Sequence, residues 1–446
     1  MTYLTFWLNG LLAGRNPAPY HFVNLGLHLT SVWLAYRVFR RLLGCETAWL
    51  AAAIFAVHPF QAEPVNYVFA RSSLLTTLLC LATLWEWTAD RPWRATAWFV
   101  LAVLAKEECA TFPLFLLLLE VWQGRKLGRF LYPIAVMLSV AGAAAIRVAF
   151  ATAKPDSGAG WNAGITPAAY LLTQGSVILR YFRMLALPWG FSVDPDISAA
   201  TVPQGLLAWS VLLVSIAVAV TLFRKTKPAF WFLGGLILLA PTSSIFPAAD
   251  LAVDRRMYLP LIAWAPCVAM LLAKVRPGLL VCLVLLLAAL AGERTWVWRT
   301  EETLWADAMA NAPRKVRPRI QLSRALEPAR ALQLLRETES IAPDDPSVSS
   351  ELGKVLIATG HPEQALVAFG RALALEPNNA ASLNNRGVAL QQMSQTAAAR
   401  QDFQRALSKD PCLFDARINL RRLGASDAPP TGCHWTQEQQ NQFEGR

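Results

Sequence analysis

The sequence has 446 residues, of which 55% are hydrophobic and 16% are charged, and its mean hydropathy is +0.35. A soluble globular chain carries about 25% charged residues, so this composition excludes an ordinary soluble protein and indicates that lipid surrounds much of the chain. The formal net charge of +11 comes largely from short basic loops between apolar stretches. Such loops reflect membrane orientation, so the charge does not require a nucleic-acid partner.

Ten apolar stretches precede residue 293 and predict a polytopic helical bundle, although several are shorter than the roughly 20 residues that cross a bilayer. They cover residues 21–41, 47–58, 66–86, 93–106, 108–122, 130–150, 206–223, 229–246, 257–274 and 278–292. Arg and Lys cluster in alternate loops, at 37–41, 91–94, 125–129, 224–227 and 274–276. Because basic loops stay in the cytoplasm, both chain ends are predicted on the other side. The stretch 168–188 does not fit this alternation and is predicted as an amphipathic helix at the outer surface.

Polar and charged side chains gather on the predicted outer side. His21, Asn24 and His28 have i, i+3, i+7 spacing and share one face of the first stretch. Ionisable residues also occupy the outer loops: His58, Glu63, Arg71, Lys106, Glu107, Arg255, Arg256 and Tyr258. Singly, Lys106 and Glu107 fit an ordinary interfacial ion pair equally well. Together, cations beside carboxylates suit a ligand that carries a phosphate, because such groups are costly near a bilayer unless paired or used.

From about residue 294 the chain becomes soluble in character and repeats with a period of 34 residues. That interval separates Pro343, Pro377 and Pro411, and the pairs Gly353/Gly387, Ala365/Ala399, Phe369/Phe403 and Ala372/Ala406. Small residues at fixed positions let two antiparallel helices approach, and Pro ends the second helix. This is the tetratricopeptide pattern, which predicts a short helical solenoid.

These patterns predict an all-α chain with a membrane domain at 1–293, a junction helix at 294–318, repeats at 319–424 and a tail at 425–446. The full repeats are 346–379 and 380–413. Their inner face offers polar contacts to an extended peptide, from Asn384, Asn385, Arg386 and Gln391. A short structural cap is the alternative role.

The seven cysteines indicate little about function. Cys412 and Cys433 lie in the predicted external part, where a disulfide between them is one of the possibilities. No Cys or His spacing typical of a metal site occurs, so no metal is expected.

Several motifs resemble those of the transmembrane and tetratricopeptide-repeat O-mannosyltransferases and their bacterial relatives. They are the stretch from His58 through Glu63 to Arg71, Ala-Lys-Glu at 105–107, Pro241-Thr-Ser-Ser and Asp254-Arg-Arg-Met-Tyr-Leu-Pro. The resemblance runs from about residue 3 to residue 424. It implies a GT-C-type bundle, a polyprenyl-phosphate sugar as donor substrate, and an active site on the non-cytoplasmic face, which is the periplasmic face in a bacterium.

By that similarity, six residues are expected to bind the donor: His58, Arg71, Lys106, Arg255, Arg256 and Tyr258. Glu63 and Glu107 are the candidates for catalysis. The family also carries an acidic catalytic residue in its first external loop, whereas no Asp or Glu precedes Glu46 here. We therefore expect that the chain begins after that loop and that it is either part of a longer enzyme or an inactive copy.

Three functions remain open at the level of sequence. The first is transfer of a sugar such as mannose to an acceptor such as a protein Ser or Thr, with no cofactor beyond the lipid-linked donor. The second is a non-catalytic membrane scaffold whose repeats recruit other proteins. The third is a transporter of lipid-linked sugar, which should show an internal duplication that the sequence does not reveal.

Overall fold

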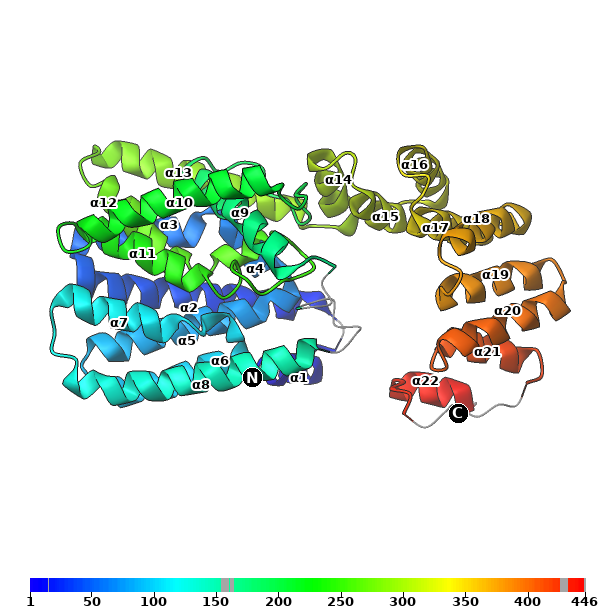
Figure 1. The fold of residues 1–446 in the computed structure, drawn as a ribbon, viewed down its shortest axis with the longest axis horizontal. Helices are drawn as coiled ribbons and strands as arrows, with labels where there is room; N and C mark the ends of the chain where they lie inside the picture. Colours follow the sequence, from blue (N-terminus) through cyan, green and yellow to red (C-terminus); the bar gives the residue numbers. More distant parts are fainter. Residues whose placement is uncertain (15, 154–159, 161–163, 426–431, 445–446) are drawn as a thin grey trace. The chain divides into compact units, whose positions relative to one another are not determined.

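The computed structural model describes residues 1–14, 16–153, 160, 164–425 and 432–444. Helices dominate these residues, which confirms the all-α prediction (Figure 1). The chain forms two compact units, Met1–Thr300 and Glu301–Arg446. The first unit therefore extends past residue 293, the predicted end of the membrane domain.

The first unit is a bundle whose longer helices run alongside one another (Figure 1). Its helices are α1 (Thr2–Ala13), α2 (Pro17–Leu43), α3 (Cys45–Val57), α4 (Ala62–Asn66), α5 (Arg71–Thr88), α6 (Pro92–Ala105), α7 (Phe112–Gln123), α8 (Gly128–Thr152), α9 (Pro167–Ala186), α10 (Val202–Leu222), α11 (Lys227–Leu239), α12 (Leu261–Leu271) and α13 (Pro277–Val297). Prolines occupy the first turn of many of them, where the missing N–H has no helical partner to lose. The stretch predicted as an amphipathic helix is α9.

Among the residues that the structure describes, four helical segments are long and apolar enough to cross a membrane. They are Val68–Thr88, Gly128–Thr152, Val202–Leu222 and Pro277–Val297. Four shorter apolar helices accompany them, at Cys45–Val57, Pro92–Ala105, Lys227–Leu239 and Leu261–Leu271. The predicted count of ten crossings therefore stays a prediction, since helix length and composition support four spans directly.

Aromatic packing forms the core of the bundle. Phe39, Phe115 and Trp231 are fully buried, and the ring of Phe39 meets Trp231 edge-on with centroids 6.0 Å apart. These rings bring α2, α7 and α11 together. The outer surfaces of α8 and α10 remain apolar, as with Phe150 at 75% and Leu207 at 68% exposed, as expected of lipid-facing helices.

The second unit is the predicted solenoid of helix pairs. It comprises α14 (Glu301–Asn311), α15 (Val316–Ala325), α16 (Pro328–Ile341), α17 (Pro346–Ala358), α18 (Pro362–Leu375), α19 (Ala380–Gln392), α20 (Thr396–Lys409), α21 (Phe414–Arg422) and α22 (Gln437–Glu444). The prediction of one junction helix at 294–318 is wrong, because these residues divide among the end of α13, all of α14 and the start of α15. Pro313 follows the end of α14 by two residues, and proline cannot continue a helix.

The period of 34 residues has a direct packing cause. A Cβ atom added at Gly353 in α17 would lie 2.6 Å from the ring of Phe369 in α18, and Gly387 meets Phe403 at the same distance. Only glycine allows the ring to sit against the helix backbone, so each pair closes around one glycine and one phenylalanine.

The tail closes against the last repeat helix. Cys412 and Cys433 form a disulfide, which was one of the possibilities that the sequence allowed. The indole of Trp435 donates to the carbonyl of Cys412 at 2.9 Å and packs edge-on against Phe414, with ring centroids 5.2 Å apart. These contacts cover the end of the solenoid that has no further repeat.

We expect Gly353→Ala to destabilise the α17–α18 pair by about 1–3 kcal/mol, because the new methyl overlaps the Phe369 ring. Gly370→Ala in α18 is the matched control. A Cβ there meets nothing within 4 Å, so the better helix propensity of Ala should stabilise the helix by up to about 1 kcal/mol. Hydrogen exchange of α17 and α18 amides in the full chain measures both changes. Equal protection in the two variants would contradict the packing explanation.

Candidate functional site

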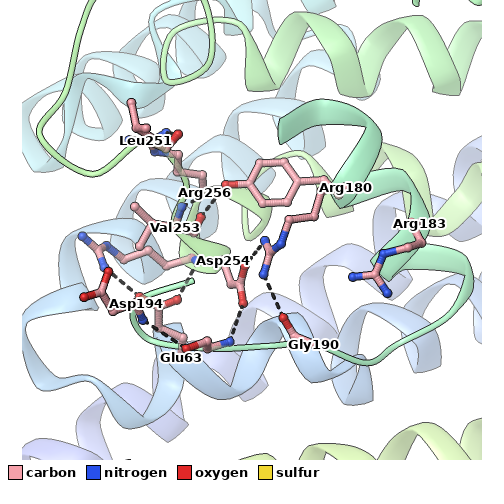
Figure 2. Close-up of polar contacts among 12 residues, drawn as sticks. Glu63, Arg180, Arg183, Gly190, Asp194, Leu251, Val253, Asp254 and Arg256 are labelled. Carbon is pink, nitrogen blue, oxygen red and sulfur yellow. Dashed lines mark hydrogen bonds and ion pairs between the residues drawn. The ribbon is translucent and has the colours of Figure 1, made fainter. Parts of the chain in front are cut away.

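Two loops and one helix bring four charged side chains together in the first unit. The loop after α3 supplies Glu63 in α4, and the 3-10 turn η5 (Asp254–Met257) supplies Asp254 and Arg255. Helix α9 supplies Arg180. We call these four residues the charged network, and Figure 2 shows Glu63, Asp254 and Arg180 within it.

Glu63 and Arg255 make a two-point contact. Arg255 Nη1 donates to Glu63 Oε1 at 2.7 Å, and the backbone N–H of Arg255 donates to Oε2 at 3.0 Å. Burial raises the pKa of the Glu63 carboxyl, and the Arg255 guanidinium opposes that rise. Because both carboxylate oxygens are engaged, Glu63 is placed to orient Arg255 and neutralise it in part.

Asp254 and Arg180 form the second pair. Arg180 Nη1 donates to Asp254 Oδ1 at 2.8 Å, while its Nη2 donates to the carbonyl of Gly190 at 2.9 Å (Figure 2). The backbone N–H of Ser192 donates to Asp254 Oδ2 at 3.3 Å. The pair thus ties α9, η5 and the segment after α9 into one arrangement.

Arg256 hydrogen-bonds to the backbone of the loop before η5. Its Nη2 donates to the carbonyl of Asp250 at 2.7 Å, and its Nη1 donates to the carbonyl of Leu251 at 3.2 Å and to the Tyr170 hydroxyl at 3.3 Å. All of these acceptors are neutral. Within the described ranges Arg256 makes no ion pair, so its positive charge is available to an anion.

Two hollows adjoin the charged network. The larger has a volume of about 640 Å³ between α9 and α10, and Arg180, Asp196 and Gln204 line its polar part while Leu207 and Val211 line its apolar part. The smaller has a volume of about 10 Å³, enough for roughly one water, and its lining includes Glu63, Asp254 and Arg294. A polar centre therefore lies next to an apolar hollow along a candidate span.

His58 precedes the turn that leads to Glu63 and does not bring a charge to the charged network. Burial lowers the pKa of His58 to about 4, so its imidazole is neutral at pH 7. Its Nδ1 accepts from the backbone N–H of Phe60 at 3.3 Å, and its ring stacks on Phe60 with centroids 5.1 Å apart. If His58 binds a phosphate, as the sequence predicted, it must do so with an uncharged imidazole ring.

The structure places Arg71 in a separate buried network. Arg71 is fully buried and donates to Asn9 Oδ1 at 2.6 Å, to Asn24 Oδ1 at 2.9 Å and to the carbonyl of Tyr20 at 3.1 Å. The amide of Asn9 is a partner that the sequence interpretation missed. Its signal was present, because Asn9 is a polar residue within an otherwise apolar run.

The remaining predicted residues are dispersed. Tyr258 is fully buried and its hydroxyl meets His28 Nδ1 at 2.9 Å, whereas His21 is exposed. His21, Asn24 and His28 therefore do not act as one polar surface. His21 is exposed, Asn24 bonds with Arg71, and His28 bonds with Tyr258. Burial of this kind keeps Tyr258 from direct contact with a ligand.

Lys106 pairs with Glu108 at 2.6 Å and donates to the hydroxyl of Ser73 at 2.9 Å. The sequence suggested an ordinary ion pair between Lys106 and Glu107. In the structure Lys106 pairs with Glu108 instead. Glu107 begins the 3-10 turn η3 (Glu107–Cys109), in which Glu108 is buried and Glu107 is partly exposed.

The polar face predicted in the repeats is partly engaged within the second unit. Arg386 makes a two-point contact with Asp402 at 2.6 and 2.7 Å, which links α19 to α20. Asn384 accepts from Asn419 at 3.0 Å and donates to Asn385 at 3.2 Å. Gln391 is partly exposed at the end of α19. Arg386 therefore has a structural partner, which the sequence interpretation did not include.

Among the residues that the structure describes, no three His, Cys, Asp or Glu side chains converge as metal ligands. The chemistry that this arrangement offers is binding of an anion by arginines, with carboxylates close by.

Comparisons with known proteins support the resemblance seen in the sequence. A protein O-mannosyl-transferase of Caenorhabditis elegans is 25% identical over 347 residues, which cover 73% of this chain and 50% of the relative. Protein O-mannosyl-transferase TMTC3 of Mus musculus is 24% identical over 439 residues, which cover 84% of this chain and 48% of the relative. The curated homologues are protein O-mannosyl-transferases. The chain spans about half the length of these relatives.

The repeats are also supported by comparison. Residues 308–385 match the family model described as tetratricopeptide repeat. The crystal structure of yeast Tom70 aligns with 92% of this chain and 88% of its own at 12% identity, with a TM-score of 0.26. A score this low carries no argument, so the repeat assignment depends on the family model and on the glycine and phenylalanine packing.

We expect Arg255→Ala to lower the stability of the full chain by about 3 kcal/mol, because it leaves the buried Glu63 carboxylate without its charged partner. Arg183→Ala is the control, since Arg183 donates to the carbonyl of Trp189 and forms no ion pair with any residue that the structure describes. It should change stability by less than about 1 kcal/mol. Thermal unfolding in detergent measures both. Replacing Glu63 and Arg255 together by Gln and Ala should recover part of the loss, and no recovery would contradict the pairing argument.

Proposed function

We propose that this chain is the membrane and repeat portion of a glycosyltransferase that moves a sugar such as mannose from a polyprenyl phosphate to a protein Ser or Thr hydroxyl. The observation that carries the proposal is the charged network beside the apolar hollow of α9 and α10. A lipid-linked phosphate needs this combination, with cations for its headgroup and apolar surface for its chain. The protein O-mannosyl-transferase homologues support the type of reaction.

The hollow suits the lipid part of such a donor. Leu207 and Val211 of α10 line it, and both are exposed on the surface of a candidate span. Arg180 lines the same hollow and belongs to the charged network. A phosphate held near Arg180 would leave the isoprenoid chain to follow α10 toward lipid.

The arginines would stabilise the leaving group. As the bond between sugar and phosphate breaks, the departing polyprenyl phosphate gains negative charge, and positively charged donors held in place stabilise that charge. Arg180, Arg255 and Arg256 are the candidates. Glu63 and Asp254 would act as positioning residues, because each accepts a hydrogen bond from an arginine of this set. The acceptor hydroxyl must lose its proton to another carboxylate, and Glu107 is the remaining predicted candidate.

The repeats would hold the acceptor polypeptide. Asn385 and Gln391 are partly exposed on α19 and offer amide groups that can bond an extended backbone. We place the repeats on the non-cytoplasmic side, as the loop charges favour. The disulfide between Cys412 and Cys433 supports this side, because disulfides persist in oxidising compartments.

A non-catalytic scaffold is the second candidate. The observation that favours it is the engagement of both Glu63 oxygens by Arg255, which leaves that carboxylate poorly placed to take a proton. A scaffold would retain the repeat surface and bind partners without turnover.

Transfer from a polyprenyl-phosphate mannose carrying a radioactive sugar to a Ser/Thr peptide decides between the two functions. We expect Arg180→Gln to lower transfer at least tenfold, as loss of a charge-assisted contact of about 1.5–3 kcal/mol implies. Arg183→Gln lies on the same helix outside the network and should retain activity within about twofold. Absence of both transfer and donor binding in the unaltered chain would favour the scaffold, whereas donor binding without transfer would fit a portion of a longer enzyme.

Placing a phosphatase that is active only outside the cytoplasm after Leu423 tests the side of the repeats. We expect an active fusion, because the five basic loops fix the parity of the chain. If the repeats lie outside the cytoplasm, Cys412 and Cys433 should stay disulfide-bonded and resist maleimide labelling in intact cells until a reductant is added. A silent phosphatase with freely labelled cysteines would reverse the proposed topology.

A further inference from the structure

Two turns meet at one border of the bundle. The candidate span Val68–Thr88 ends just before Asp90, and the candidate span Gly128–Thr152 begins just after the turn that holds Arg125. Since one segment ends and the other begins here, the joined turns lie at a membrane–water interface. These turns contain no residue of the charged network and take no part in the proposed reaction.

Asp90 joins the two turns. Its Oδ1 atom lies 3.1 Å from Arg125 Nη1 and 2.5 Å from Arg129 Nη2. Asp90 has a backbone φ of 60°, a left-handed conformation that Asp tolerates better than most residues. One half-exposed carboxylate oxygen therefore holds two arginines side by side.

The arginines border a hollow of about 490 Å³, which we call the interfacial hollow. Its lining consists of Arg125, Lys126, Gly128, Arg129 and Phe130. In each arginine one terminal guanidinium nitrogen contacts Asp90, and further guanidinium N–H groups remain as donors. Lys126 is exposed and makes no ion pair in the part of the chain that the structure describes.

The carboxylates near the hollow do not neutralise it. Besides Asp90, Glu120 lies 3.8 Å from Arg125 Nη1, but it is fully buried and accepts from the indole of Trp87 at 2.8 Å. Three cations thus face one accessible carboxylate. The first turn of α8 adds backbone N–H groups, and it has no side-chain cap.

We infer that the interfacial hollow binds the phosphate of an anionic phospholipid headgroup. Three cations and a helix N-terminus select a phosphate, and the position at a membrane border selects a lipid as its source. Beyond the hollow, α8 exposes Leu131 and Tyr132, at 52% and 78%, which provide apolar and interfacial contacts for the acyl chains. A free phosphate has the same headgroup chemistry but gains nothing from this surface.

Native mass spectrometry of the detergent-purified full chain with phosphatidylglycerol or phosphatidylcholine tests the inference. The variant is Lys126→Gln/Arg129→Gln. The matched control is Arg224→Gln/Lys225→Gln, which removes the same charge from exposed residues of another basic loop. We expect the first variant to lower the affinity for the first bound phosphatidylglycerol about tenfold and the control less than twofold. Affinity for phosphatidylcholine should remain equal in all three proteins.

Competition with inorganic phosphate distinguishes a lipid headgroup from free phosphate as the ligand of the interfacial hollow. If the hollow takes a headgroup, phosphate at millimolar concentration should leave bound phosphatidylglycerol in place. Displacement of the lipid by phosphate alone would overturn the lipid assignment. Equal losses in the variant and the control would show a general effect of basic loops, and would overturn the site itself. Thermal unfolding of both variants shows whether the fold is retained, and single Lys126→Gln, at an exposed position, repeats the test if the double variant is unstable.

Discussion

A charge inside an apolar body requires a partner from another part of the chain, and in this protein that requirement joins the loops that form the site. Glu63 and Arg255 are almost two hundred residues apart in sequence, yet the carboxylate meets both the guanidinium and the backbone N–H of the arginine. Removing Arg255 would leave the Glu63 carboxylate buried without its charged partner. The pair thereby fixes η5 against the loop that follows α3, and Asp254 in the same turn fixes Arg180 of α9.

The same requirement is met differently at Arg71. There the guanidinium is surrounded by amide and carbonyl oxygens from α1 and α2, among them Asn9 and Asn24. Neutral acceptors satisfy the N–H groups without cancelling the charge, so Arg71 is suited to holding helices together. Arg256, beside the charged network, also has neutral acceptors only, but it is partly exposed whereas Arg71 is fully buried. That difference in exposure is why we propose ligand binding at Arg256 and the network, and a structural role for Arg71.

The second unit is stabilised by local, repeated packing. Each of two helix pairs closes where a glycine meets a phenylalanine ring, and the interval of 34 residues follows from the length of one pair and its turns. Such units depend on their neighbours, so the end of the stack needs cover. The disulfide of Cys412 and Cys433 and the packing of Trp435 on Phe414 supply it.

The sequence by itself determined the helical class, a change in character that it placed near residue 294, and the repeat with its glycine and phenylalanine positions. These depend on local periodicity and on composition, which are properties of neighbouring residues. It also identified Glu63 and Arg255 as outer polar residues, but not that they meet.

Only the tertiary structure decided that Lys106 pairs with Glu108, that Tyr258 bonds with His28, and that Arg386 is held by Asp402. The physical reason is that each of these contacts depends on how loops and helices pack in space, and the spacing of residues along the sequence does not give the distance between their side chains.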